Sequence, residues 1–309
     1  MPNSINRDQD SDEFLKLISS STNVYSICKR ISSSQTALAV IAASLGPLLA
    51  WLDPSLRVWA ALAGIMVLVL DAIILDPWLD RNRQLGTKIQ ELFDTRLFQL
   101  RWNKLKCGAL PDQEAIGEHA RAYQRSHPAL KNLREWYPPV GDVPLAYARL
   151  ICQRSNLRWD MSLRKRYAFM LLITLVVLTL GGLGYAVWSK LTAEQLVMSV
   201  LVPVLPLVNR LGKESKEQYR VADDLENQKS YIEDLWQRSI SESSMSDEQL
   251  LEESRRLQDA IFDRRLKSPR VPDLLHRFLR DEHQVQMEEA AKNYVTQIKL
   301  AFGKGSSKK

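Results

Sequence analysis

The chain alternates between long apolar runs and polar, charged segments. One run, from Ala168 to Trp188, holds twenty-one residues with no ionisable side chain. At about 1.5 Å per residue it forms about 31 Å of helix, close to the roughly 30 Å hydrocarbon core of a bilayer. Buried helices of soluble proteins rarely contain so long an apolar run without a polar stripe. The run therefore predicts a membrane-spanning helix.

Three further apolar runs complete a pattern of two hairpins. Thr36 to Leu52 and Val58 to Leu75 are separated only by the polar turn of residues 53–57, so the two helices they predict must be antiparallel. Ala193 to Val208 follows the run of residues 168–188 after an equally short connection. The pattern predicts four transmembrane helices in two hairpins.

Three residues inside these spans are candidates for a pore or a gate. Pro203 and Pro206 interrupt the fourth run, and since proline removes a helix hydrogen bond, we expect a kink or break there. That irregularity is either a gate or a short, partly re-entrant packing helix. Asp71 is a carboxylate about one turn from the end of the second span, where it either lines a water-filled path or reaches the interface.

Lysine and arginine mark the cytoplasmic side of the predicted membrane. They cluster at 29–30, 81–83, 158–166 and 210–220, whereas the two short turns hold only Arg57 and Lys190. This bias predicts a multi-pass membrane protein with both termini in the cytoplasm. The resulting domains are a cytoplasmic N-terminal segment (1–35), a first transmembrane hairpin (36–76), a cytoplasmic helical insert (77–166), a second transmembrane hairpin (167–208), a cytoplasmic helical C-terminal region (209–303) and a disordered tail (304–309).

The cytoplasmic segments show helical and no strand periodicity, so the predicted fold class is an all-α membrane protein with a helical cytoplasmic body. Helices are expected over 85–98, 111–126, 129–136 and 213–240. A further helix begins at Ser246, which forms a capping-box pattern with Gln249. Its apolar face consists of Leu250, Leu251, Leu257, Ile261 and Phe262.

Composition excludes several classes of function. The formal net charge of +6 lies mainly beside the apolar runs, which indicates topology and anionic headgroups rather than a nucleic acid polymer. Three scattered cysteines and four histidines without ligand spacing support neither a disulfide framework nor a metal site. No glycine-rich phosphate loop and no nucleophile and base pattern is present. We expect no enzyme, cofactor or metal.

One polar, aromatic cluster resists so simple an explanation. It lies before the third span and in an Arg-Trp-Asn string further upstream. Its residues either form a satisfied structural network or bind an anionic planar ligand through arginine and tryptophan. They are Arg149, Gln153, Arg154, Asn156, Trp159, Asp160, Arg164, Trp102 and Asn103.

Four strings carry a resemblance to a known family. They are LFDTRLFQLRWN (92–103), WYPPVGDVPLAYARLICQRSNLRWD (136–160), LRKRY (163–167) and SPRVPDLLHRFLRDEHQVQM (268–287). Together they resemble the SMODS-associated four-transmembrane effector family, regarded as pore-forming effectors of bacterial CBASS-type antiphage defence. One departure is Leu274, Leu275 and His276 where the family pattern is more aromatic. The resemblance implies triggering by a nucleotide second messenger.

The sequence thus predicts a membrane effector, oligomeric and pore-forming, that disrupts the bacterial inner membrane when this pathway is triggered. The expected partners are the lipid bilayer, further copies of the chain, and a cyclic oligonucleotide that is sensed directly or through a partner. The alternative is a membrane-anchored helical interaction or scaffold protein without a pore.

The cation bias makes the topology testable. A reporter active only in the periplasm should give signal when fused at Asp53 or Lys190, and none when fused at Gly117 or at the C-terminus, because only the two short turns are expected to cross the membrane. Reporter activity in whole cells measures this. Signal at Gly117 would overturn the hairpin arrangement.

Overall fold

The computed structural model describes residues 3–241, 245–268 and 289–301, without the side chains of 46, 47, 50, 51, 54, 57, 158–160 and 162. All its regular elements are helical, and the described residues contain no β-strand, which confirms the all-α class. The short helices are α1 (Ile5–Asp8), η1 (Pro54–Leu56), α5 (Lys104–Cys107), α6 (Gln113–Ser126) and η3 (Lys131–Leu133).

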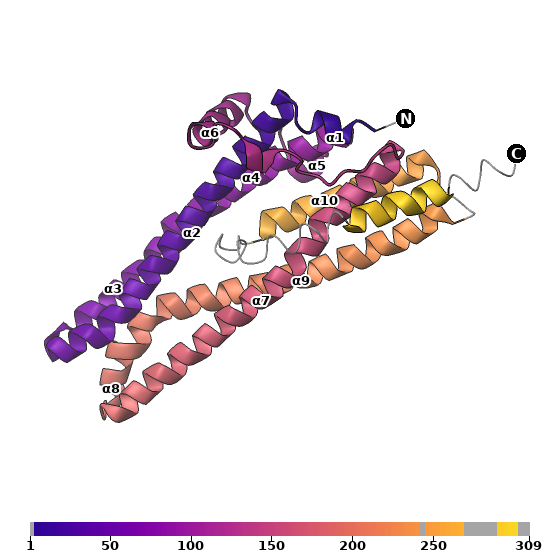
Figure 1. Cartoon of the computed structure of the whole chain (residues 1–309). Helices are drawn as coiled ribbons and strands as arrows, with labels where there is room; N and C mark the ends of the chain where they lie inside the picture. Colours follow the sequence, from indigo (N-terminus) through magenta and orange to yellow (C-terminus); the bar gives the residue numbers. More distant parts are fainter. Residues whose placement is uncertain (1–2, 242–244, 269–288, 302–309) are drawn as a thin grey trace, which may run out of the picture. The chain divides into compact units, whose positions relative to one another are not determined.

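Four long helical stretches dominate the described chain (Figure 1). Two are single helices, α2 (Asp12–Leu52) and α7 (Leu145–Trp188). Each of the other two contains a π-helical turn. One is composed of α3 (Arg57–Leu70), the π-helical η2 (Asp71–Leu75) and α4 (Asp76–Leu97). The other is composed of α8 (Ala193–Leu196), the π-helical η4 (Val197–Leu201) and α9 (Val202–Ile240). Each stretch joins an apolar run to a polar segment without a break. The predicted membrane boundaries therefore fall inside helices.

Three of these helical stretches are long and apolar enough to cross a membrane: Val58–Leu97, Leu163–Trp188 and Ala193–Ile240. Within the most apolar 18-residue segment of each stretch, only 22%, 11% and 33% is buried, so most of the apolar surface faces outward. They contain three of the four predicted spans. The predicted span of residues 36–52 is helical but is not among them, and four of its side chains lie outside the described part. The four-span arrangement stays a prediction.

The two prolines of the last apolar run do not break the helix. η4 precedes Pro203 and contains Ser199, whose carbonyl the proline cannot bond, while Pro206 lies inside α9. The same arrangement recurs at η2, which contains Ile73, four residues before Pro77. In both places the wider π-helical turn, with hydrogen bonds between residues five apart, accommodates the hydrogen bond that proline cannot donate. The predicted irregularity is thus a π-helical turn rather than an interruption.

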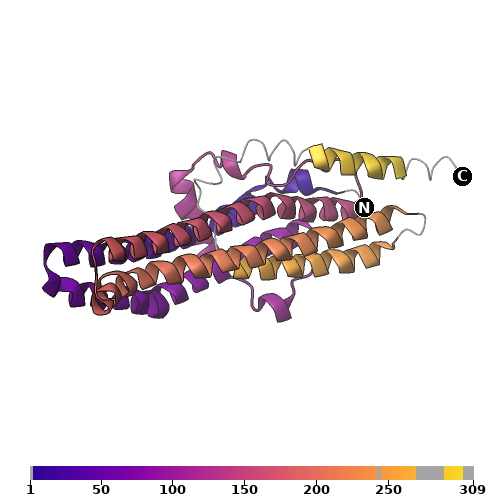
Figure 2. The same cartoon turned by 90° about the horizontal axis from the view of Figure 1, so that it is seen from below.

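The chain forms two compact units, which we describe separately. The body unit comprises residues 1–25, 83–164 and 221–309, and the span unit comprises 26–82 and 165–220. In the body unit, α10 (Asp247–Lys267) runs antiparallel beside the C-terminal half of α9, and Gln228 donates to the Ala260 carbonyl at 3.3 Å (Figure 2). A helical segment over 289–301 packs through Tyr294 edge-on against Trp236.

The body unit tests the predicted helices individually. The capping box at Ser246 and Gln249 is confirmed, and Leu250, Leu257, Ile261 and Phe262 are buried, whereas Leu251 is exposed. The helix expected over 129–136 is wrong: only the turn η3 forms there. The reason is local, because Leu130 and Glu135 adopt left-handed backbone conformations (φ 48° and 52°) that end any helical repeat.

Close packing in the span unit depends on Gly64. A Cβ atom at this position would lie 2.9 Å from the Val202 carbonyl oxygen and 3.1 Å from the Cα of Pro203. Both neighbours are backbone atoms, which cannot move aside as a flexible side chain would. Gly64 is therefore required where α3 approaches the start of α9.

We expect Gly64→Ala to destabilise the protein by about 1 to 3 kcal/mol, the usual effect of an overpacked contact. Thermal unfolding in detergent measures the loss. Gly181→Ala is the matched control, because no described atom lies within 4 Å of a Cβ there, and it should leave the melting temperature unchanged or slightly raised. Equal melting temperatures for the two variants would contradict this packing.

Candidate functional site: two buried polar networks

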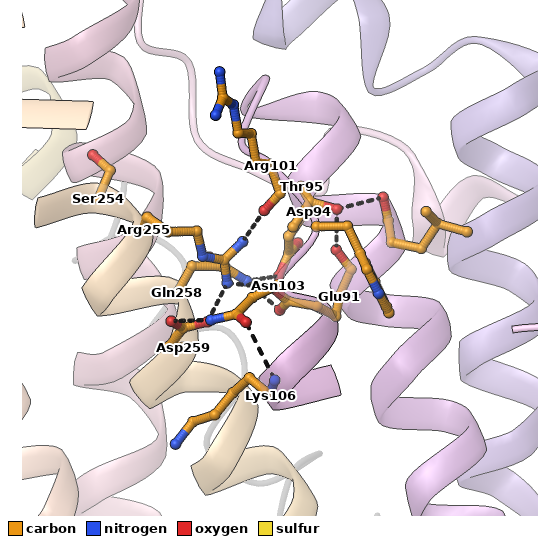
Figure 3. Close-up of polar contacts among 12 residues, drawn as sticks. Glu91, Asp94, Thr95, Arg101, Asn103, Lys106, Ser254, Arg255, Gln258 and Asp259 are labelled. Carbon is orange, nitrogen blue, oxygen red and sulfur yellow. Dashed lines mark hydrogen bonds and ion pairs between the residues drawn. The ribbon is translucent and has the colours of Figure 1, made fainter. Parts of the chain in front are cut away.

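The body unit contains a buried pair of acids. Glu91 and Asp94 are three residues apart on α4, so they share a helix face, and both are fully buried. Facing them, α10 supplies the cations. Arg255 Nη2 donates to Glu91 Oε1 at 2.7 Å (Figure 3). Arg265 Nη1 donates to Asp94 Oδ2 at 2.5 Å. Gln258 Nε2 bridges the two acids at 2.8 and 3.0 Å. Each buried acid thus has a cationic partner.

Two elements extend this body network. Tyr137 donates its hydroxyl hydrogen to Asp94 Oδ1 at 2.7 Å, and Asn156 Nδ2 donates to the Tyr137 hydroxyl at 3.1 Å. Gln153 Nε2 donates to Gln258 Oε1 at 3.1 Å and to the Ser254 carbonyl at 2.8 Å. α7 is therefore joined to α4 and α10 through amides, a phenol and a carboxylate.

Burial sets the protonation of the body network. It raises the pKa of Glu91 to about 7; the nearby charge of Asp94 acts in the same direction and Arg255 opposes both. Burial also raises the pKa of Tyr137 well above its usual range, so the phenol stays protonated and can donate. For Arg265, burial disfavours the charged form, but Asp94, Tyr137 and Tyr25 together outweigh this effect and the pKa is raised.

The remaining residues singled out in the sequence have other contacts. Arg149 is buried and its Nε donates to the Phe98 carbonyl at 2.5 Å. Arg154 lies over the Tyr294 ring, with its Cζ 4.5 Å from the ring centroid, and 3.5 Å from a Glu233 oxygen. Trp102 Nε1 donates to the Gly108 carbonyl at 2.9 Å. These three residues lie in separate contacts rather than at one site.

Asn103 connects the upstream string to the body network. Its Nδ2 donates to Asp259 Oδ2 at 2.8 Å, and Asp259 also pairs with Arg255 (Figure 3). Arg164 is buried. The side chains of Trp159 and Asp160 lie outside the described residues. Of the predicted cluster, the structure therefore brings Gln153, Asn156 and Asn103 into one network.

Sequence reasoning missed the acids and cations at the centre of this network. A signal was present in the string ELFDT, where two carboxylates at helical spacing flank the apolar Leu92 and Phe93. Such acids lie on or near an apolar face and need partners once that face is buried. Their partners on α10 could not be identified, because about 160 residues separate them in sequence.

The body unit also has a pocket of about 750 Å³, between the start of α2 and α6. Lys16, Arg121 and Arg134 line it together with Asp12 and Glu118. None of these five exposed side chains forms an ion pair with another described residue. None belongs to the body network. The pocket is thus a separate surface feature lined by charges of both signs.

The span unit contains a second network, which we call the span layer. Gln35 Nε2 of α2 donates to Asp76 Oδ1 at 2.9 Å, and Lys213 Nζ of α9 donates to Asp76 Oδ2 at 2.7 Å. Tyr167 of α7 donates to Glu214 Oε1 at 3.0 Å. Arg210 hydrogen-bonds Ser32 and lies 3.6 Å from Glu214. The span layer therefore holds all four long helical stretches together.

Asp71 lies beside Gln35 and Arg210 of the span layer. Asp71 is buried in η2, and its Oδ1 has no hydrogen-bond partner among the described residues. The same holds for the buried Oε1 of Gln35. Pro203 instead contacts the Gly64 region. No cluster of three or more His, Cys, Asp or Glu that could hold a metal occurs in the part of the chain that the structure describes.

These features define a helical protein with apolar, membrane-type helices and a helical body. The family model of the SMODS-associating 4TM effector domain matches residues 3–294, nearly the whole chain, and the chain belongs to this family. It is 26% identical over 194 residues to a probable CBASS effector molecule from Bacillus cereus (strain VD146). That match covers 62% of this chain and 62% of the relative. No solved structure matches the chain.

The raised pKa of Glu91 predicts how stability depends on pH. Between about pH 4.5 and 7 the folded chain holds a proton on Glu91 that the unfolded chain has lost. Because the folded state binds more protons, stability falls as the pH rises through this window, by at most about 3 kcal/mol from this group. Melting temperatures between these limits should show the decrease, and Glu91→Gln should flatten it.

Glu252→Gln provides the control for this measurement. Glu252 lies on α10, is 65% exposed and pairs with Arg256 at the surface. An exposed pair contributes little to stability, so this variant should keep the pH dependence of the unmodified protein. An unchanged slope in Glu91→Gln would show that Glu91 does not titrate in this window.

Proposed function

We propose that this chain is the membrane effector of a bacterial second-messenger defence pathway, and that several copies open a pore in the inner membrane once the pathway is triggered. Membership of a CBASS-associated effector family supports the pathway. The observation that carries the pore is the combination of outward-facing apolar helices with a polar span layer between them that contains the buried charges of Arg210 and Glu214. A purely anchoring helix bundle has no need of buried charges at that level.

The small extent to which the apolar helices cover one another supports oligomerisation. The most apolar 18-residue segment of Leu163–Trp188 is only 11% buried within one chain. Four helices enclose little space for water, so a conducting path needs helices from more than one copy. The open surface of α7 is available for such packing, and the hydroxyls of Thr174 and Thr179 on it bond their own helix. The lipid-facing side thus stays apolar.

The span layer is the proposed gate. Its contacts join helices that must separate if water is to pass between them, and Asp76 bonds both Gln35 and Lys213. Arg210 and Glu214 of the layer are buried, and separating them without water is costly, so the closed state is stable. In a wet environment the free oxygens of Asp71 and Gln35 gain water as a partner. Hydration of the layer therefore favours the open state.

Triggering requires a ligand or partner that binds the open state more tightly, because equal binding to both states shifts nothing. We propose a cyclic oligonucleotide, sensed directly or through a partner. Gln153 and Arg149 are buried in internal contacts, so a ligand reaches them only if the body unit rearranges. Because α7 carries these residues and the third apolar run, such a rearrangement would act on the membrane helix itself.

The alternative is a membrane-anchored scaffold that recruits other proteins. The observation that favours it is the internal pairing of Arg149, Gln153 and Asn156, which suits a rigid structural body. The two functions differ in one consequence. A scaffold inserts into membranes without conducting ions.

The decisive experiment is ion flux. Purified protein in potassium-loaded vesicles should release potassium when cyclic di- and trinucleotides are added, or constitutively when the gate is weakened. We expect the double variant Arg210→Gln, Glu214→Gln to leak without a trigger, because it removes the buried ion pair of the span layer. The double variant Glu217→Gln, Arg220→Gln removes a surface pair within α9 and should stay closed.

Two outcomes would contradict the pore. One is vesicles that stay sealed with every nucleotide and with the double variant, although the protein is inserted. The other is triggered cells that keep their membrane potential while a nucleotide pool collapses, which would indicate an enzyme.

A further inference from the structure

We propose that the span unit binds anionic phospholipid headgroups through four exposed cations, one from each long helical stretch. We call them the cationic belt. This proposal rests on the proposed insertion of the apolar runs into a membrane, and it is independent of whether a pore opens. The four residues are Arg30 of α2, Arg81 of α4, Arg166 of α7 and Lys216 of α9.

Contacts of the span layer place the belt at one level. Arg30 lies five residues before Gln35, and Arg81 lies five residues after Asp76, the residue that Gln35 bonds. At 1.5 Å per residue both cations are within about 8 Å of the layer along their helices. Each lies on the side of the layer away from the apolar run, as the headgroup region of a bilayer requires.

The other two cations have the same relation to the layer. Arg166 immediately precedes Tyr167, and Lys216 follows Glu214 by two residues, while Tyr167 and Glu214 are themselves hydrogen-bonded. In both cases the cation again lies beyond the layer on the polar side. All four helical stretches therefore present a positive charge at the same depth.

These charges are available to a ligand. All four side chains are exposed, and none forms an ion pair or hydrogen bond with another described side chain. Their neighbours on α9 differ, since Lys213 pairs with Asp76 and Arg220 with Glu217. These two cations of the span unit are thus neutralised by carboxylates of the same chain. The four belt cations form no such pair with a described side chain, so they can bind an external anion.

The surroundings of the belt select a lipid rather than a soluble anion. Trp78, 51% exposed, lies three residues before Arg81, and tryptophan is enriched at the headgroup level of membranes. Phe169 and Met170 follow Arg166 and are also exposed. Apolar surface, an amphipathic ring and a cation thus succeed one another along the helices. A phospholipid presents acyl chain, glycerol and phosphate in the same order.

Bound headgroups would also stabilise the span unit. Four unpaired cations near Arg210 and Lys213 repel one another, and headgroup phosphates at the same level remove that repulsion. The closed span layer should therefore be most stable in membranes that contain anionic lipid.

The experiment measures lipid preference directly and without a trigger. The full-length protein is reconstituted into vesicles of equal parts phosphatidylcholine and phosphatidylglycerol, and the immobilised fraction of each spin-labelled lipid is determined. We expect phosphatidylglycerol to be preferred. The preference should fall by at least about fivefold when the belt is neutralised, since one cation near an anionic surface has about that effect. The belt variant is Arg30→Gln, Arg81→Gln, Arg166→Gln and Lys216→Gln.

Salt and a matched variant give the controls. Raising the ionic strength from about 0.1 to about 1 M shortens the screening length from about 10 to about 3 Å and should weaken the preference. The control variant removes four exposed, unpaired cations of the body unit and should retain it. These are Lys104→Gln, Arg121→Gln, Arg125→Gln and Arg134→Gln.

Several outcomes would overturn the proposal. Equal immobilisation of both lipids by the unmodified protein would do so, as would an equal loss in the belt and control variants. Equal melting temperatures of the unmodified protein in vesicles with and without phosphatidylglycerol would contradict the stabilising role. A preference for phosphatidylglycerol without potassium flux would leave the lipid site intact and refute only the pore.

Discussion

Burying a charged or hydrogen-bonding group without a partner costs much free energy, and this cost determines which helices of the protein pack together. Glu91 and Asp94 are fully buried and each is paired with an arginine of α10. In the span unit, the buried Arg210 of α9 lies beside Glu214 and hydrogen-bonds Ser32 of α2. Segments far apart in the sequence must therefore come together for either unit to form. The two networks then specify which helix faces meet, a task that apolar contacts alone perform loosely.

The same constraint explains the two π-helical turns. A helix inside a membrane must satisfy its own backbone hydrogen bonds, and a proline removes one of them. The described chain accommodates Pro77 and Pro203 with the wider turns η2 and η4, so neither helix ends. π-Helical turns are often found at functional sites, and η2 contains Asp71. An irregularity caused by proline thereby places a carboxylate beside the proposed gate.

The long helix α7 carries residues of both polar networks. α7 carries Gln153 and Asn156 of the body network, and beyond them the third apolar run and Tyr167 of the span layer. Residues of both networks therefore belong to one continuous helix. In the proposed function, the cost of opening the span layer is met by ligand binding, and the cationic belt couples that cost to the lipids present.

The sequence by itself determined what depends on local and near-local pattern: the all-α class, three apolar helices of membrane length and the capping box at Ser246. Periodicity and capping are properties of neighbouring residues, so they can be predicted without knowing the fold. Only the tertiary structure decided the partners of Glu91, Asp94 and Asp76, because a charged residue in a helical pattern shows that a partner is needed and not which one. The left-handed Leu130 and Glu135 belong with these, since nothing in their residue types indicates that backbone conformation.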